Sequence, residues 1–394
     1  MDLKIFTDNI EDSALEQINL LMSQDAFKGC KVRIMPDVHA GAGCVVGFSA
    51  NLADKVIPNI VGVDIGCGMS WAKVKGTLDL SKLDEVIKSN IPAGMNIRED
   101  ILPSLIDLKA LRCYKKLKNE EYLLQSMGSL GGGNHFIEVD VDEDNNYYLV
   151  VHTGSRNLGK QVCEIYQKKA MSNCSYRKES LQEQKLVIEK FKSEGKEYLI
   201  EDTLKEIRKR YHGKYKLPAD LCYIDGTDRE DYLFDMRIAQ KWAQENRKHI
   251  INIIVSRLGL EIEEYNETIH NYIGDDNIIR KGAISAKNGE LVLIPMNMRD
   301  GCLVCVGKGN DDWNRSAPHG AGRLMSRADA KNQLTLDEFK KQMKGIYTST
   351  ATLDTLDEAP MAYKPMEEIV SKIQDTVDII KVIKPIYNFK ASEL

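Results

Sequence analysis

Five of the seven histidines occur in short segments that are rich in glycine, proline or other small residues. They are His39 in PDVHAG, His135 in GGGNHFIE, His152 in VVHTGSR, His270 in IHNYIG and His319 in APHGAGR. The other two, His212 and His249, lie in charged helical segments and are interpreted as surface residues. Any one of the five, taken alone, is more often structural than functional. Their number, together with the carboxylate and the thiol described next, indicates a functional site.

The segment VGVDIGCGM, residues 61–69, adds a carboxylate and a thiol three residues apart, Asp64 and Cys67. It can form a glycine turn around a buried thiol, or a turn that presents two metal ligands. With three or more imidazoles, these side chains are a donor set typical of a transition metal. Imidazole and thiolate exclude a purely Mg²⁺ or Ca²⁺ cage, because those ions prefer oxygen. Zinc, manganese, iron and cobalt remain open, and the long irregular spacing excludes a zinc finger.

Residues 307–327, GKGNDDWNRSAPHGAGRLMSR, contain a second candidate group. Between Arg299 and Arg327 there are five Lys or Arg against three Asp, so this stretch is locally basic. A helix is expected from Gly322, and the first N–H groups of a helix can bind phosphate. Because imidazole nitrogen forms covalent intermediates, His319 is a candidate nucleophile toward phosphorus. A glycine-rich loop before a capped helix is an equally good interpretation of the local pattern.

Two further motifs are interpreted as structural. Cys302 and Cys305 have CxxC spacing, but they lie in an apolar run and no second CxxC accompanies them, which favours a strand. The segment GSRNLGK, residues 154–160, resembles a phosphate-binding loop. The position after it is Gln161, where that loop requires Ser or Thr to hold Mg²⁺. We therefore do not expect a P-loop.

The bulk composition is that of an ordinary globular protein. The chain has 394 residues, of which 43% are hydrophobic and 29% charged. The acidic N-terminus predicts no signal peptide, and no apolar run is long enough for a membrane span. Nine scattered cysteines argue against a disulfide framework and predict a cytoplasmic protein. The net charge of −5 gives no general basic face, so any nucleic-acid contact must rely on local positive charge.

The spacing of apolar residues and of turn-forming residues along the chain predicts alternating strands and helices. Strands and tight turns are expected over residues 30–75, a helix over about 80–125, and a buried strand at 147–151. A helical excursion is expected over about 160–255, strands over 281–306, and helices after Gly322 and over 366–382. The glycine-rich turns that carry the histidines lie between strands, where functional sites are common.

Eight segments, in order, resemble the signature blocks of the RtcB-type RNA ligases. They are PDVHAGAG, VGVDIGCGM, LGGGNHFIE, VHTGSRNLG, IHN, APHGAGRLMSR, DEAPMAYK and YNFKA. The blocks extend from about residue 35 to residue 391, which is nearly the whole chain. The resemblance implies a single large α+β domain over residues 1–394, with mixed central sheets flanked by helices.

The resemblance implies a GTP- and Mn²⁺-dependent ligase that joins a 2′,3′-cyclic phosphate or 3′-phosphate RNA end to a 5′-hydroxyl end, in RNA repair or tRNA splicing. It implies two manganese ions, bridged by Cys67, with the ligands Asp64, Cys67, His135, His152 and His270. His319 would attack the α-phosphorus of GTP and form a histidine–GMP intermediate. The guanylyl group would pass to the RNA 3′-phosphate, and attack by the 5′-hydroxyl would release GMP.

The resemblance also assigns the remaining site residues. The nucleotide would be held by Asn134, Glu138, Ala321, Gly322, Tyr363 and Lys390. Arg323 would face phosphates one helical turn after His319, and Asp37 would act near the metal and the RNA end. The segment IPMNMR, residues 294–299, differs from the Gly-Ser-Met-Gly that many members carry after Ile-Pro, which affects the guanine side of the pocket.

Two other functions fit the same residues. A metal-dependent phosphohydrolase acting on RNA ends would use the same cluster without a guanylylated histidine. A non-catalytic RNA-binding or translation-associated protein would not need Cys67, but the acidic net charge disfavours broad electrostatic binding. The pattern does not indicate a membrane partner, and it does not specify an activating protein.

Overall fold

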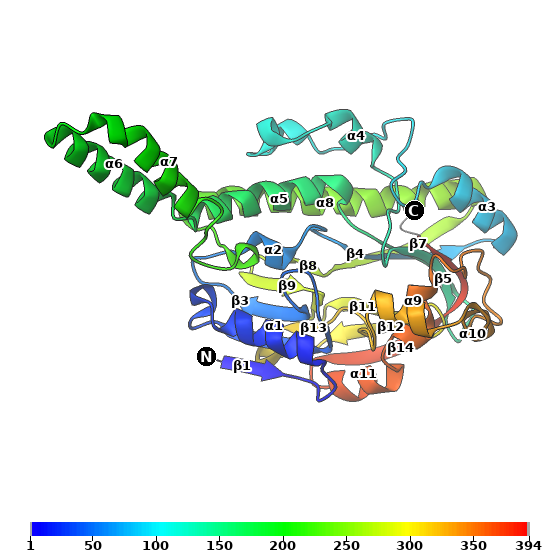
Figure 1. Ribbon diagram of the computed structural model, residues 1–394. Helices are drawn as coiled ribbons and strands as arrows, with labels where there is room; N and C mark the ends of the chain where they lie inside the picture. The colour runs from blue at the N-terminus through cyan, green and yellow to red at the C-terminus, as the bar shows by residue number, and fades with distance from the viewer. Residues whose placement is uncertain (1, 392–394) are drawn as a thin grey trace.

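Two β-sheets form the centre of the molecule, and the computed structural model describes residues 2–391 (Figure 1). The smaller sheet has the order β1-β2-β3-β9-β8, and β1 and β2 are parallel whereas the other pairs are antiparallel. Its strands are β1 (Asp2–Ile5), β2 (Lys31–His39), β3 (Val46–Asn51), β8 (Asn271–Ile273) and β9 (Ile278–Lys281). A two-stranded ribbon, β10 (Ala283–Ser285) with β13 (Ser316–Pro318), leads to the segment of His319.

The larger sheet is antiparallel, with the order β11-β12-β14-β5-β6-β4-β7. Its strands are β4 (Gly68–Lys75), β5 (Phe136–Val141), β6 (Tyr147–Thr153), β7 (Glu261–Ile269), β11 (Leu291–Asn297), β12 (Gly301–Gly307) and β14 (Val377–Lys390). The long strand β14 pairs with β12 along residues 377–383 and with β5 along residues 384–390. A register shift between Pro385 and Tyr387 lies at the start of the part that pairs with β5. Bulges bend and twist a strand, so the sheet curls.

A layer of helices covers one face of the larger sheet (Figure 1). The helix α8 (Gly226–Leu258) packs on β4 and β6, and α5 (Arg156–Asn173) and α3 (Leu80–Asn90) pack beside it. At 33 residues, α8 is about 50 Å long. Fully buried side chains along it, including Tyr232, Met236 and Trp242, join the hydrophobic core between this helix layer and the smaller sheet.

Shorter helices surround the rest of the sheets. They are α1 (Asp12–Met22), α2 (Pro58–Val61), α4 (Glu120–Gln125), α9 (Arg327–Gln333), α10 (Leu336–Gln342) and α11 (Met366–Ile373). Eight 3₁₀ turns are described: Asp25–Phe27, Leu108–Ala110, Tyr114–Lys116, Glu197–Leu199, Ala219–Leu221, Asp311–Trp313, Leu356–Glu358 and Pro360–Ala362.

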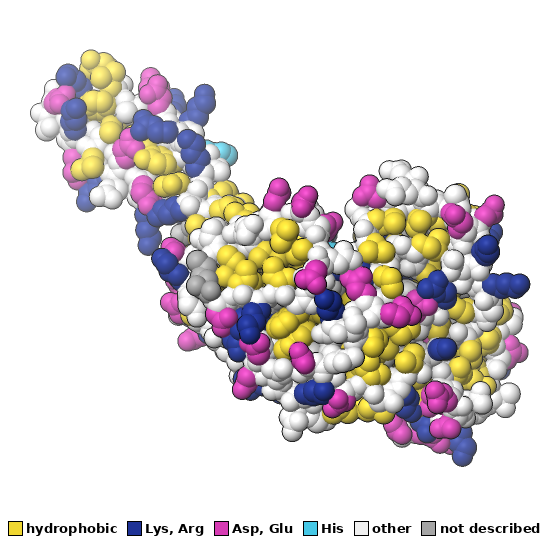
Figure 2. Space-filling view, turned by 90° about the horizontal axis from the view of Figure 1, so that it is seen from below, with side chains coloured by type: hydrophobic (Ala, Val, Ile, Leu, Met, Phe, Trp, Pro, Cys, Tyr) yellow, Lys and Arg dark blue, Asp and Glu magenta, His cyan; other side chains and the backbone are white. Residues whose placement is uncertain are grey.

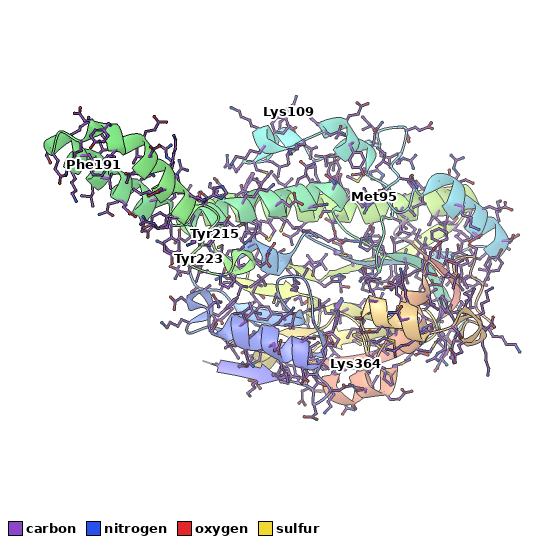
Figure 3. The ribbon with its side chains drawn as sticks, in the orientation of Figure 1. Met95, Lys109, Phe191, Tyr215, Tyr223 and Lys364 are labelled. Atoms are coloured by element: carbon purple, nitrogen blue, oxygen red, sulfur yellow. The ribbon has the colours of Figure 1, made fainter. Side chains whose placement is uncertain are left out.

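A helical hairpin projects away from the body (Figures 1 and 2). It consists of α6 (Arg177–Ser193) and α7 (Ile200–Tyr211), and we call residues 177–216 the arm. In Figure 3, Phe191 lies on the arm and Tyr215 lies where the arm joins the body. The helices from α5 to α8 confirm the predicted helical excursion, and the mixed sheets with flanking helices confirm the α+β class.

Three predicted helices are wrong in part. The stretch 80–125 is helical only in α3 and α4 and in short 3₁₀ turns, because Pro92, Gly94 and Pro103 interrupt it. No helix starts at Gly322: residues 320–326 are bends and irregular backbone with one bridge residue, Arg323, and α9 begins at Arg327. Beyond α11, residues 377–382 belong to β14, since their β-branched residues favour a strand.

Within residues 2–391, none of the helices is both long and apolar enough to cross a membrane. All nine cysteines are buried and free of disulfides, as the composition predicted.

Candidate active site with a metal-capable cluster

The turn before β4 presents Asp64 and Cys67 to the interior. The N–H of Cys67 donates to the carbonyl of Asp64 at 3.2 Å, and Gly66 has φ +70, a conformation that favours glycine. Gly68 lies against the backbone of Thr268 on β7, and an added Cβ would overlap it. The fully buried Arg247 of α8 donates to the carbonyl of Gly66 at 2.9 Å. The thiol is buried in a glycine turn, as the first interpretation predicted, and Asp64 and Cys67 are directed to one place. Their role as metal ligands stays a prediction.

Four neighbouring strands bring the cluster together. Their order is β5-β6-β4-β7, and the ligand-type residues lie at one end of them. His135 directly precedes β5, Cys67 directly precedes β4, His152 is on β6, and His270 directly follows β7. Residues far apart in the sequence thus meet because adjacent strands end at the same sheet edge.

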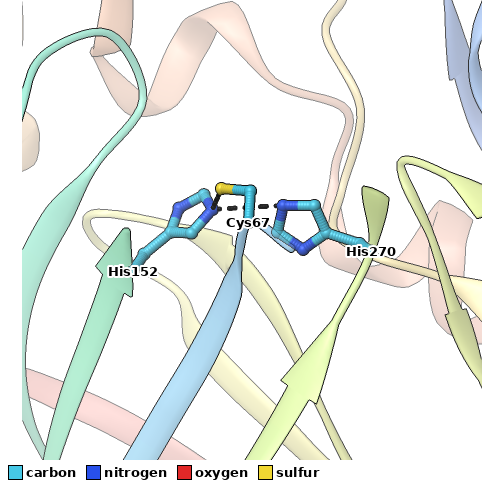
Figure 4. Close-up of side chains that lie close together, drawn as sticks. All are labelled: Cys67, His152 and His270. Carbon is cyan, nitrogen blue, oxygen red and sulfur yellow. Dashed lines mark hydrogen bonds between the residues drawn. The ribbon is translucent and has the colours of Figure 1, made fainter. Parts of the chain in front are cut away.

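Cys67 is the centre of the cluster. Its Sγ lies 3.4 Å from Nε2 of His135 and 3.4 Å from Nε2 of His152. The Nε2 atoms of His152 and His270 are also 3.4 Å apart (Figure 4). Nε2 of His135 lies 3.0 Å from Oδ2 of Asp64. Two groups of three ligand atoms result, Asp64–Cys67–His135 and Cys67–His152–His270, and they share the thiol.

Hydrogen bonds orient the ligand atoms on the Asp64 side. Nδ1 of His135 contacts the carbonyl of Leu130 at 2.9 Å. A carbonyl only accepts, so Nδ1 carries the proton and the Nε2 lone pair faces Asp64 and Cys67. The other carboxylate oxygen of Asp64 accepts from the N–H of Ser155 at 3.1 Å. Gly154 is also required, because a Cβ there would overlap the Asp64 carboxylate.

The protonation of the cluster matches a cation site. Burial and neighbouring imidazoles hold the pKa values of His152 and His270 well below 6.5, so both rings are neutral at neutral pH. The pKa of Asp64 lies at about 2, although burial acts to raise it, so this carboxyl is ionised at neutral pH. Burial and the Asp64 charge raise the pKa of the Cys67 thiol well above 9. The two imidazoles and the Asp64 carboxylate therefore offer unprotonated ligand atoms, and a bound cation would displace the proton of the Cys67 thiol.

His319 lies beside this cluster, with its ring centroid 4.7 Å from that of His270. Its Nδ1 contacts Oδ2 of Asp37 at 2.7 Å, and its backbone N–H donates to the same oxygen at 3.1 Å. Asp37 is fully buried behind the ring. Because a carboxylate accepts, Nδ1 holds the proton and Nε2 keeps a free lone pair. His39 supports Asp37 through Nδ1, 3.0 Å from the Asp37 carbonyl, and burial lowers the pKa of His39 to about 4.

A cavity of about 670 Å³ contains most of the predicted site residues, a volume suited to a nucleotide. Twelve of the fourteen line it: Asp64, Cys67, Asn134, Glu138, His152, His270, His319, Ala321, Gly322, Arg323, Tyr363 and Lys390. The other two, Asp37 and His135, lie directly behind His319 and Asp64. The divergent segment also reaches the cavity, through Met296, Asn297 and Met298.

Glu358 holds three cationic side chains, Arg323, Arg327 and Lys390, at one wall of the cavity, which we call the cationic wall. Lys390 contacts its carboxylate at 2.7 Å, Arg327 at 2.6 Å and Arg323 at 3.3 Å. The hydroxyl of Tyr363 donates to it at 2.6 Å. Burial acts to raise the pKa of Glu358, but these three cations lower it to about 2. The wall thus holds fixed positive charge where a phosphate or a base carbonyl can meet it.

Sequence reasoning missed Glu358, Arg327 and Arg247. Glu358 is part of the DEAPMAYK block, but its partners are distant in the chain and no spacing identifies them. Arg247 is an ordinary basic residue of a long helix, and only the fold shows that it fixes the Gly66 turn.

The two motifs that were set aside are structural, as predicted. Cys302 packs with a core cluster on one face of β12, and Cys305 packs with another cluster on the opposite face. In the P-loop-like segment, the Ser155 N–H binds Asp64, and Gln161 binds Lys118 and Asn157.

The geometry defines an enzyme-like site in which a metal-capable cluster faces a histidine with a free ring nitrogen. The chain matches the family described as tRNA-splicing ligase RtcB over residues 21–110 and 109–391. It is 27% identical to the RNA-splicing ligase RtcB of Escherichia coli strain K12, covering 95% of this chain and 93% of that protein. It is 26% identical to the tRNA-splicing ligase RtcB of Methanococcus maripaludis, covering 97% and 92%. The chain therefore belongs to the RtcB family of RNA ligases.

Proposed function

We propose that this chain is a GTP- and Mn²⁺-dependent ligase that joins 2′,3′-cyclic phosphate or 3′-phosphate RNA ends to 5′-hydroxyl ends, in RNA repair or tRNA splicing. The observation that supports this most directly is the contact of His319 with Asp37 at 2.7 Å, beside the cluster of Cys67. A neutral imidazole held through Nδ1 presents Nε2 as a nucleophile. The whole chain from residue 1 to 394 would act as one ligase unit.

The first chemical step forms a bond between Nε2 of His319 and the α-phosphorus of GTP, and pyrophosphate leaves with the electron pair of the broken bond. The imidazole becomes positively charged in that step, and the Asp37 carboxylate stabilises it through the Nδ1–H. A 2′,3′-cyclic phosphate end is first hydrolysed: water attacks its phosphorus and the P–O2′ bond breaks, which leaves a 3′-phosphate and a 2′-hydroxyl. An oxygen of the 3′-phosphate then attacks the phosphorus of the guanylylated His319, and the bond from that phosphorus to Nε2 breaks, which frees His319. Finally the 5′-hydroxyl attacks the phosphorus of the RNA 3′-phosphate, loses its proton, and displaces GMP.

The donor set fits two manganese ions. Asp64, Cys67 and His135 would hold one ion, and Cys67, His152 and His270 the other, so the thiolate would bridge them. A pair of cations stabilises the attacking and leaving oxygens of a phosphoryl displacement. The chain's own contribution is to direct these lone pairs inward, through the Leu130 carbonyl and the Ser155 N–H.

The nucleotide would lie between His319 and the cationic wall. Lys390 is fixed between the Asn134 carbonyl at 2.9 Å and Glu358 at 2.7 Å, so its ammonium has a defined position. Glu138 is buried, and burial raises its pKa to about 7. A carboxyl there would contact the base edge, and Ala321 and Gly322 would allow the phosphates close to the backbone.

Labelled GTP tests the proposal. The protein, loaded with Mn²⁺, should form an acid-labile guanylyl adduct that His319→Ala abolishes and His249→Ala retains, since His249 only binds the Pro103 carbonyl outside the cavity. Running the assay with ATP and with other metals measures the selectivity. Release of phosphate from RNA ends without any adduct would instead indicate the phosphohydrolase.

A further inference from the structure

A second hollow, of about 480 Å³, lies where the arm joins α5. Five of the residues that line it are basic: Lys168, Arg177, Arg208, His212 and Lys214. None of its lining residues is an Asp or Glu, although the chain as a whole is acidic. We call these five residues the basic pocket. All five are exposed to solvent, so their side chains are available to a ligand.

The basic pocket belongs to a region whose charge is opposite to that of the rest of the chain. Residues 177–216 contain 12 Lys and Arg against eight Asp and Glu, whereas the remainder contains 42 against 51. In Figure 2, Lys and Arg side chains are spread over the arm and the place where it meets the body. A local positive region on an acidic protein attracts a polyanion to one place.

The cations of the basic pocket are not used by the fold. Neighbouring basic residues form ion pairs: Arg210 with Glu183 at 2.7 Å, and Lys216 with Glu179. Within residues 2–391, the basic pocket residues have no acidic partner, and Arg208 uses only its Nε, to donate to Gln184 at 3.1 Å. Positive charges held together without partners carry a repulsion that a bound anion removes.

Aromatic rings complete the hollow. Tyr211 and Tyr215 line it, and both are half-buried. Tyr176 packs near Tyr211, with the ring centroids 6.1 Å apart. Basic side chains with adjacent aromatic faces are the combination that binds single-stranded nucleic acid, by phosphate contact and base stacking.

The helix α5 connects this hollow to the catalytic cavity. It starts at Arg156, next to the Ser155 N–H that binds Asp64, and it ends at Asn173 beside the arm. Its 18 residues span about 27 Å. The structure therefore fixes the separation between the metal-capable cluster and the basic pocket.

From the unpaired cations, the aromatic rings and this fixed distance, we propose that the basic pocket binds the phosphodiester backbone of the RNA substrate, away from the ends being joined. This inference rests on the proposed function for the identity of the ligand as RNA. It predicts that the enzyme distinguishes RNA by length: a strand that reaches the arm gains contacts that a short strand lacks.

Charge reversal tests the inference. The variant Lys168→Glu/Arg177→Glu/Lys214→Glu alters the basic pocket, and Lys185→Glu/Lys190→Glu/Lys192→Glu makes the same charge change farther out on α6. The probe is a labelled RNA that is long enough to reach from its 3′-phosphate to the basic pocket, about 27 Å away. Its binding is measured by fluorescence anisotropy at several salt concentrations. The basic pocket variant should weaken binding at least about tenfold and reduce the log–log salt slope by about 2, as expected for three lost phosphate contacts. The other variant should change both much less.

The controls separate this inference from the proposed function. Both variants should form the guanylyl adduct at the rate of the unaltered protein and should ligate a short RNA normally. If no protein forms an adduct, the proposed function fails, while the binding assay still tests the basic pocket. Equal loss of binding in the two variants, or no loss in the basic pocket variant, would overturn the inference. The neutral variant Lys168→Gln/Arg177→Gln/Lys214→Gln is the control for misfolding caused by added acidic residues. It should also weaken RNA binding and reduce the salt slope, but by less than the charge-reversal variant.

Discussion

Asp37 and His319 are joined by two hydrogen bonds to a single carboxylate oxygen, one from the imidazole Nδ1 at 2.7 Å and one from the backbone N–H at 3.1 Å. The carboxylate is fully buried, and no donor among residues 2–391 reaches its other oxygen, Oδ1. The pair therefore fixes both the tautomer and the direction of the ring. Asp37 lies behind His319, which is itself beside the metal-capable cluster. The implied role of Asp37 near the metal and the RNA end stays a prediction.

Asp37→Asn should slow guanylylation of His319 by about 100-fold or more, because a neutral amide cannot stabilise the charge on the imidazole once Nε2 is bonded to phosphorus. The initial rate of label transfer from GTP measures this. Asp275→Asn, which removes an exposed partner of Arg237, should leave the rate unchanged. Equal rates for Asp37→Asn and the unaltered protein would show that Asp37 does not assist the nucleophile.

Cys67→Ala should abolish the binding of two manganese ions and the ligase activity with little change in fold. The thiol is shared by both groups of ligand atoms, so its loss leaves each group with two ligands. Metal content after loading and desalting, by mass spectrometry, is the measurement. Cys305→Ala is the matched control, since it removes a buried thiol on β12 that is remote from the cluster. Retention of two ions by Cys67→Ala would contradict the bridging role.

Gly154→Ala should weaken manganese binding by about 10- to 100-fold, the usual effect of disturbing a group that orients a metal ligand. The new methyl group would occupy the position of the Asp64 carboxylate and push it away from His135. Isothermal titration of the metal-free protein with Mn²⁺ gives the affinity. Ser155→Ala keeps the backbone N–H that binds Asp64 and should bind the metal normally.

Much of this site could be predicted because its residues lie in glycine-rich turns at the ends of apolar strands. Asp64, Cys67 and His152 each sit in such a turn or at its edge, and adjacent strands had to bring some of them together. Residue spacing could not show that β7 joins the same edge, since that depends on strand order, and only the resemblance assigned His270 to the cluster. The guanine preference and the roles of the individual site residues stay predictions.

The errors in the fold have physical causes. The helix expected over 366–382 ends at Ile373, and residues 377–382 pair instead with β12, a partner that the local sequence does not indicate. Pro385, a residue type that is rare inside central strands, lies at a register shift just after β14 changes partner from β12 to β5. The helix expected at Gly322 fails because Arg323 pairs with Tyr363 in an isolated bridge, a contact between distant segments that local pattern cannot reveal.

Glu358→Gln should lower the free energy of unfolding at neutral pH, and this destabilisation should disappear in acid. The pKa of Glu358 falls from about 4.5 in the unfolded chain to about 2 in the fold, because Lys390, Arg327 and Arg323 outweigh its burial. The stabilisation is therefore complete above about pH 4.5 and is lost as the pH falls through 2. A shift of this size corresponds to roughly 3 kcal/mol at pH 7.

Urea unfolding at pH 7 and at pH 3 measures the difference in free energy of unfolding between the variant and the unaltered protein, which should shrink at the lower pH. Glu121→Gln, at an exposed position on α4, should show no such difference at either pH. An equal destabilisation by Glu358→Gln at both values would mean that packing, rather than the three cations, accounts for the role of Glu358.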